Sequence, residues 1–185
     1  MIYKSARSIH VTGLVQGVGF RPFIYRMAVL FHISGWVVNG NDGVRIHAEG
    51  SEKDIDSFIR NIKDKAPAAA QILSIRVSNA ELKEFSSFQI YESKDYSDEV
   101  TEISPDIAVC DDCLADMKLQ PHRYDYPFIN CTNCGPRFSI IRGLPYDRVK
   151  TTMEPFLMCP VCRKEWGKVP ETAGGTTAKT PGAIR

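Results

Sequence analysis

The chain of 185 residues carries 23 basic and 22 acidic side chains and a formal net charge of +1, and its length suits one domain or two small ones. So balanced a charge provides no sequence-wide field for attracting nucleic acid or an anionic membrane, and neither is expected as a partner. No segment approaches the roughly 20 consecutive apolar residues that span a bilayer, so we expect a cytoplasmic protein with a small ligand.

A strand and a helix are predicted on either side of a glycine-rich loop near the N-terminus. Side chains alternate over Ser8–Leu14, with the period of a strand. The helix is expected to begin near Pro22, because proline is tolerated in a first turn, and to pack one apolar stripe on a sheet. The stripe consists of Phe23, Met27, Leu30 and Phe31.

A hairpin is predicted after this helix, because two short strands surround residues that accept a tight turn. The apolar strand Gly35–Asn39 is followed by the sequence GNDG at 40–43, and a second strand follows it. In that second strand three apolar residues alternate with three polar ones, namely Val44, Ile46 and Ala48 with Arg45, His47 and Glu49.

A second helix and two further strands complete the first unit. Ser51 and Asp54 resemble a capping box, so a helix is expected to start there and to end before Pro67. The apolar stripe of this helix consists of Ile55, Phe58, Ile59 and Ile62. The first of the later strands is marked by Leu73, Ile75 and Val77, and the second by Phe88 and Ile90. The order β-α-β-β-α-β with an added terminal strand predicts an α+β, ferredoxin-like fold with an antiparallel sheet for residues 1–91.

The glycine-rich loop is the main candidate for a binding site. Gly13, Gly17 and Gly19 let backbone N–H groups turn inward, and the following helix adds the positive end of its dipole. Arg21 supplies a permanent charge with a planar fork of donors suited to phosphate oxygens. Eighteen residues later, Asn39 carries a carboxamide that can orient a water molecule without ionising. We interpret the combination as a site that hydrolyses a phosphate ester or anhydride.

Plainer interpretations of the same residues stay open. The glycines could form only a tight connection between strand and helix. Arg21 could be a solvated residue in the first turn of a helix, and Asn39 an ordinary residue at a hairpin turn. A nucleotide loop of the Walker type is disfavoured, because no Gly-Lys-Ser/Thr follows the glycines.

Hydrolysis of a mixed anhydride needs neutralisation of charge and a positioned water molecule more than it needs a strong base. In keeping with this, no His, Asp or Glu stands at an obvious catalytic spacing in the first half of the chain.

The glycine loop, the sequence GWVVN at 35–39 and the order of elements resemble the acylphosphatase family across roughly the first 91 residues. The resemblance implies hydrolysis of a carboxyl phosphate. It also implies that Arg21 clamps the phosphate and that Asn39 positions the attacking water. The implied phosphate cradle consists of Val15, Gln16, Gly17, Val18, Gly19 and Phe20.

A linker is predicted at residues 92–102, which are charged and follow neither a helical nor a strand period. All six cysteines lie beyond it, between Cys110 and Cys162, in three C-x-x-C pairs. In a reducing cytosol such pairs indicate a metal site rather than disulfides. A second unit with little regular structure is therefore expected at 103–166, folded around a metal and followed by a disordered tail at 167–185.

The first two cysteine pairs have the spacing of a four-thiolate zinc site. The predicted ligands of a structural Zn²⁺ are Cys110, Cys113, Cys131 and Cys134. Iron in a rubredoxin-like site is the rival, and a thioredoxin-like redox pair is weaker because no βαβ pattern surrounds these residues. His122 lies between the pairs and could replace one of the cysteines, although a surface histidine is the commoner interpretation. Cys159 and Cys162 form half a second site, which could join a rearranged first site, complete a site in another chain or stay as free thiols.

The sequence RYDYPFINCTNCGPRFSI at 123–140, with LPYDRVKTTM at 144–153 and MCPVC at 158–162, resembles the zinc-finger segment of the HypF carbamoyltransferase family. The resemblance runs to about residue 166 and implies a role in the maturation of nickel-iron hydrogenases. In that family carbamoyl phosphate is cleaved, and the carbamoyl group is adenylated and passed to a cysteine of HypE. Carbamoyl phosphate and a HypE-type protein are therefore the implied substrate and partner, but this sequence holds no residues for the later steps.

The sequence departs from the family pattern in two places. The spacer between Cys113 and Cys131 has 17 residues, one fewer than is usual in the family. No further C-x-x-C pair follows Cys162, and the resemblance is lost from Gly167 onward. From this change we expect a truncated or frame-shifted coding sequence.

Two functions of different classes follow from these motifs. The first is a hydrolase of acyl phosphates that uses Arg21 and Asn39, and the second is a catalytically silent, zinc-containing interaction module. Nucleic-acid binding through the aromatic residues of the zinc segment ranks below both, because those side chains serve better as a small core around the metal.

Overall fold

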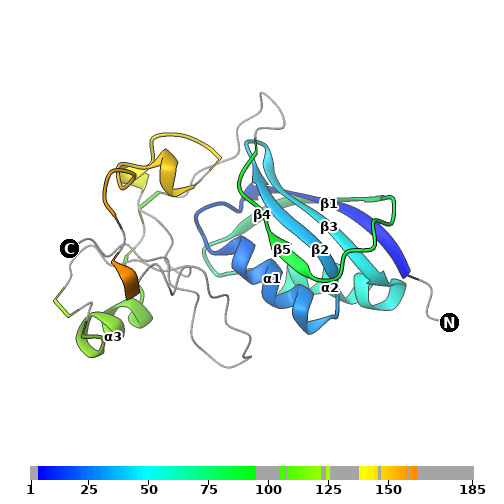
Figure 1. Cartoon of the computed structure of the whole chain (residues 1–185), viewed down its shortest axis with the longest axis horizontal. Coiled ribbons are helices and arrows are strands. Elements are labelled where there is room, and N and C mark those ends of the chain that lie inside the picture. The colour runs from blue at the N-terminus through cyan, green and yellow to red at the C-terminus, as the bar shows by residue number, and fades with distance from the viewer. Residues whose placement is uncertain are drawn as a thin grey trace.

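The computed structural model describes residues 4–94, 105–106, 108–121, 124–125, 138–145, 147–157 and 159–161. The first of these ranges forms a five-stranded sheet with two helices on one face (Figure 1). Its elements are β1 (Lys4–Leu14), α1 (Phe20–Leu30), β2 (Ser34–Gly40), β3 (Gly43–Ser51), α2 (Glu52–Asp64), β4 (Gln71–Asn79) and β5 (Phe88–Ile90). They follow the predicted order, so the ferredoxin-like α+β fold is confirmed.

The sheet has the strand order β4-β1-β3-β2-β5 and is mixed rather than wholly antiparallel. β1 pairs antiparallel with β3 and β4, and β2 pairs antiparallel with β3. β5 is parallel to β2, with Phe88 opposite Gly35 and Ile90 opposite Val37. The antiparallel prediction is wrong at this edge, because the chain crosses the sheet after β4 and enters β5 in the direction of β2.

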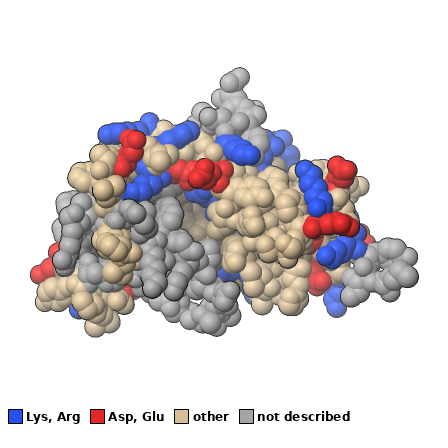
Figure 2. Space-filling model, viewed as in Figure 1, with Lys and Arg blue, Asp and Glu red and all other residues tan. Residues whose placement is uncertain are grey.

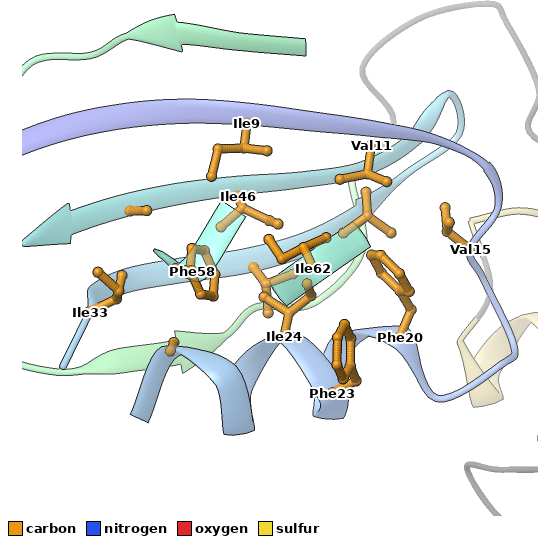
Figure 3. Packing of buried hydrophobic residues seen from close by; sticks show 14 of the residues in the cluster. Ile9, Val11, Val15, Phe20, Phe23, Ile24, Ile33, Ile46, Phe58 and Ile62 are labelled. Atoms are coloured by element: carbon orange, nitrogen blue, oxygen red, sulfur yellow. The ribbon is translucent and has the colours of Figure 1, made fainter. Parts of the chain in front are cut away.

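The core lies between the sheet and the two helices (Figure 3). Its fully buried large side chains include Ile9 and Val11 of β1, Ile46 of β3, Ile24 of α1, and Phe58 and Ile62 of α2. The predicted stripe of α2 is confirmed, and Ser51 is its N-cap, with its Oγ accepting a hydrogen bond from the Asp54 N–H at 3.2 Å. Among the residues that the structure describes, this core contains no cysteine.

Helix α1 begins at Phe20, two residues before the predicted start, and its buried face is turned relative to the predicted stripe. The buried residues are Phe20, Phe23, Ile24 and Ala28, with Met27 and Phe31 packed beside them. Leu30 is 54% exposed, so its predicted place in the core is wrong. At about 100° per residue, the centre of the buried face lies near Ile24 and Leu30 falls on its flank.

Strand β4 contains a bulge that the sequence pattern did not predict. Thr12 pairs with Ser74 but the next residue, Gly13, pairs with Ile72, so Leu73 is the extra residue and is 71% exposed. Gly13 has φ of +116°, and an added Cβ there would lie 2.2 Å from the Gln71 carbonyl oxygen. The bulge therefore places Ile72 and Ile75 against the core and corrects the predicted alternation of Leu73, Ile75 and Val77.

The polar residues of β3 are not all at the surface, because the chain between β4 and β5 covers the face of the sheet opposite the helices. Glu49 is fully buried, and its Oε1 lies 2.8 Å from Nε2 of His47. Its carboxylate also accepts hydrogen bonds from the backbone N–H groups of Lys83 at 2.6 Å and Phe85 at 2.9 Å. Burial acts to raise the pKa of Glu49, but these hydrogen bonds outweigh it and lower the pKa below its ordinary value.

Beyond the sheet the described residues contain only short elements of regular structure. The expectation of little regular structure is confirmed, and the one α-helix described there, α3 (Asp111–Leu119), begins directly after Cys110 and includes Cys113. Two single-turn 3₁₀ helices follow, η1 (Phe138–Ile140) and η2 (Arg148–Lys150), and an isolated bridge joins Ile141 to Thr151. The predicted linker, the tail at 167–185, His122, Cys131, Cys134 and Cys162 lie wholly or largely outside the described residues.

None of the described helices is both long enough and apolar enough to cross a membrane. On the face drawn in Figure 2, Lys and Arg alternate with Asp and Glu, and no large area carries one sign of charge.

Candidate active site

The loop between β1 and α1 keeps its side chains inside the protein and presents its backbone. Val15, Val18 and Phe20 are buried at 2% exposure or less, so they anchor the loop in the core. Figure 3 shows Val15 and Phe20 at the end of the core next to the loop. Between them Gly17 and Gly19 have φ of 70° and 73°, in the left-handed region that side chains disfavour. Successive N–H groups in such a backbone form a concavity suited to an anion, and the first turn of α1 adds N–H groups without acceptors inside the helix.

Gln16 fastens this loop to the turn between β2 and β3. Its side chain is 3% exposed, and its Nε2 donates to the carbonyl oxygens of Gly40 at 2.5 Å and Gly43 at 3.3 Å. Gly40 directly follows Asn39, so this amide fixes the loop relative to the strand that carries Asn39. Sequence reasoning placed Gln16 in the cradle but did not foresee that its side chain would be used in this way.

The structure brings Arg21 and Asn39 together, although they come from different elements. Arg21 stands in the first turn of α1, and Asn39 stands near the end of β2 with 2% exposure. In the amide orientation that satisfies both groups, Asn39 Oδ1 accepts hydrogen bonds from Arg21 Nε at 3.1 Å and Nη2 at 3.2 Å. The pair lies beside the glycine loop, because Arg21 directly follows the loop in the sequence.

Two further residues reach Arg21 that the sequence did not single out. Asp147 Oδ1 accepts from Arg21 Nη2 at 3.0 Å, and Ser93 Oγ accepts from Nη1 at 3.4 Å. The Ser93 N–H donates to the second oxygen of Asp147 at 3.1 Å. Through Asp147 the 147–151 turn therefore contacts α1 and the chain that follows β5. Arg21 and Asp147 are 126 positions apart, and no local pattern marks such a contact.

The cysteines that the structure describes are Cys110, Cys113 and Cys159. Cys110 is the N-cap of α3, and the buried Cys113 lies in the first turn, so both thiols belong to one end of one helix. Two cysteine side chains one turn apart suit a tetrahedral metal ion. Among the described ranges no group of three or more His, Cys, Asp or Glu side chains is arranged to hold a metal. The predicted ligands Cys131 and Cys134, and Cys162 of the half site, fall outside those ranges.

Comparison with known proteins separates the chain into two matched regions. The Acylphosphatase family model matches residues 7–90, and the HypF finger model matches residues 109–141. Carbamoyltransferase HypF of Rhodobacter capsulatus is 45% identical over 159 residues, which are 85% of this chain and 21% of the relative. The acylphosphatase of Staphylococcus aureus strain Newman is 41% identical over 80 residues, which are 42% of this chain and 90% of that protein.

Among solved structures, full-length HypF in a phosphate- and nucleotide-bound form matches 90% of this chain with a TM-score of 0.86 and 48% identity. The chain spans only about a fifth of the length of these HypF proteins, namely 21% and 22%. It spans nearly all of the S. aureus acylphosphatase. The chain therefore belongs to the acylphosphatase family, and the two matched regions in this order are those of the N-terminal region of HypF-type carbamoyltransferases.

Proposed function

From this family membership we propose that the chain hydrolyses acyl phosphates at the glycine loop. For a HypF-type protein of nickel-iron hydrogenase maturation, we propose carbamoyl phosphate as the relevant substrate. The observation that carries the proposal is the contact between Arg21 and Asn39 beside a loop that presents its backbone. In this contact the Arg21 guanidinium, whose paired donors match the oxygens of a phosphate, lies next to the neutral amide of Asn39.

The phosphate is proposed to lie in the concavity formed by residues 15–20. Backbone N–H groups of the loop and the first turn of α1 neutralise part of its charge, and Arg21 supplies a full positive charge. The buried side chains of Val15, Val18 and Phe20 keep the loop rigid, so the donors are already oriented when the substrate arrives. Gln16 has the same effect through its two carbonyl contacts.

Asn39 is proposed to hold the attacking water. Its Oδ1 is directed to Arg21, and its NH₂ group serves to hold the water by a hydrogen bond. The water oxygen forms a bond to phosphorus while the bond from phosphorus to the acyl oxygen breaks. The products are a carboxylate, which for carbamoyl phosphate is carbamate, and inorganic phosphate, and the water proton passes to phosphate or solvent.

This reaction does not need a strong general base. The leaving carboxylate is a weak base, so the main requirements are neutralised charge and a water held in line. Arg21 meets the first requirement and Asn39 the second, and neither side chain has to gain or lose a proton at neutral pH.

For the second region we propose a structural Zn²⁺ held by Cys110, Cys113, Cys131 and Cys134, with Cys159 and Cys162 as half of a second site. The described pair at the start of α3 supports the thiolate donor set, and the HypF finger match supports the ligand type. Zn²⁺ supplies folding energy there rather than chemistry. A HypE-type partner and a cytoplasmic location belong to the same proposal.

The second candidate is a catalytically silent, zinc-containing interaction module. The specific observation in its favour is that Asp147 already pairs with Arg21, since a carboxylate and a phosphate use the same donors.

Release of inorganic phosphate from carbamoyl phosphate and acetyl phosphate separates the two candidates. The hydrolase proposal predicts turnover by the purified chain that falls about 10³-fold in Arg21→Ala, because the main charge on the phosphate is lost. Arg60→Ala is the matched control, since Arg60 is an arginine of α2 whose Nε donates only within its own helix, to the Asp56 carbonyl. A folded wild-type chain without turnover would support the interaction module instead.

A further inference from the structure

Asp147 is the one carboxylate for which the structure describes an ion pair with Arg21, and it comes from outside both family matches. The Acylphosphatase match ends at residue 90 and the HypF finger match at residue 141. The side chains of Arg21 and Asp147 are 17% and 28% exposed, so the pair is only partly solvated. Such a pair is held more strongly than an ion pair at the open surface.

The carboxylate is fixed from two sides. Its Oδ1 accepts from Arg21 Nη2 at 3.0 Å, and its Oδ2 accepts from the Ser93 N–H at 3.1 Å. The Asp147 backbone is held as well, because its carbonyl accepts from the Lys150 N–H at 2.8 Å. The short bridge between Ile141 and Thr151 closes the same turn. The segment therefore presents Asp147 to Arg21 in a defined position.

The contacts of Arg21 leave little of its guanidinium for a ligand while Asp147 is in place. Asn39 lies against the edge formed by Nε and Nη2, and Asp147 with Ser93 lies against the edge formed by Nη1 and Nη2. A phosphate group binds arginine through the same paired donors that a carboxylate uses. A phosphate dianion at this fork would also be repelled by the Asp147 charge.

We infer that Asp147 competes with the substrate phosphate for Arg21, so that a residue of the segment after the finger sets the phosphate affinity of the acylphosphatase site. This inference rests on the proposed function in one respect, namely that Arg21 is the phosphate ligand. Asp147 acts through Arg21, so it sets the affinity of the site for phosphate and is not a catalytic residue. Substrate binding then requires the Asp147 carboxylate to leave the Arg21 guanidinium.

The test is the affinity of the full chain for inorganic phosphate, measured by isothermal titration calorimetry. Asp147→Asn keeps the shape and removes the charge, and Asp147→Ala removes both. Both variants should bind phosphate about tenfold more tightly than wild type, since one charged competitor for the fork is gone. The matched control is Glu154→Gln, because Glu154 belongs to the same segment and pairs with Arg142 at 3.5 Å where both side chains are more than half exposed.

Steady-state kinetics with acetyl phosphate provide a second test, because a purely structural role of Asp147 would not change KM separately from kcat. In Asp147→Asn the KM should fall by a similar factor while kcat stays within about twofold, because only binding is relieved. Unchanged or weaker phosphate binding in both folded Asp147 variants would overturn the inference. If wild type binds phosphate but does not turn over, and Asp147→Asn binds it more tightly, the inference stands and the hydrolase proposal fails. If Arg21→Ala binds phosphate as wild type does, both fail.

Discussion

Glu49→Gln should lower the free energy of unfolding by about 2–3 kcal/mol, although the two side chains have nearly the same shape. Glu49 is fully buried and accepts from three donors, the His47 ring and the N–H groups of Lys83 and Phe85. The amide keeps only one acceptor oxygen and turns an NH₂ group toward groups that are themselves donors. At least one buried donor then loses its partner, and the remaining bonds lose their charge.

The measurement is urea unfolding of the full chain, followed by far-ultraviolet circular dichroism over the sheet and helices. The matched control is Glu52→Gln, which removes the same charge three positions later, where Glu52 is 75% exposed and pairs with Arg7 at 3.3 Å. A surface pair of this kind contributes less than about 1 kcal/mol. Equal unfolding midpoints for the two variants would refute the role assigned to the buried carboxylate.

The pH dependence follows from the direction of the Glu49 pKa. Because the folded state lowers the pKa, the unfolded chain takes up the proton first as pH falls, near its ordinary value of about 4.3. The stability contributed by Glu49 is therefore complete above that pH and is lost as pH falls through the folded-state pKa. Wild type should lose stability in this range more steeply than Glu49→Gln, and parallel curves for the two proteins would contradict the assignment.

Two further predictions concern the loop and the metal. Gln16→Leu should lower kcat for acetyl phosphate about tenfold or more, because it releases the loop from the Gly40 and Gly43 carbonyls. Its unfolding midpoint should change less than that of Glu49→Gln. Phosphate-release kinetics measure the first quantity, and urea unfolding measures the second. Cys113→Ser should lower the zinc content of the purified chain, measured by elemental analysis, while the unfolding transition of residues 4–94 stays in place, because the core there contains no cysteine.

Local sequence patterns predicted most of the fold. The hairpin at 40–43, the Ser51 cap and the α2 stripe each depend on residues within a few positions of one another, and each is present. Arg21 and Asn39 were combined into one candidate site from their chemistry and the family resemblance, and the structure places the two side chains in contact.

The features that were missed depend on contacts between distant segments. Leu73 lies at a bulge that arises from the pairing of β4 with Gly13, and Glu49 is buried because residues 83–85 cross above it. Neither partner shows in the pattern of the strand itself. Asp147 is the strongest case, because its partner Arg21 is 126 positions away and the intervening sequence has no period that links them.

The measurement that bears most directly on the proposed reaction compares Asn39→Ala with Asn41→Ala, the same substitution two positions along the same hairpin. Inorganic phosphate affinity and phosphate release from carbamoyl phosphate and acetyl phosphate are measured for both and for wild type. If Asn39 holds the attacking water, Asn39→Ala should lose about 10²-fold or more in kcat and still bind phosphate, while Asn41→Ala keeps both properties. Full turnover in a folded Asn39→Ala chain would contradict the proposed site.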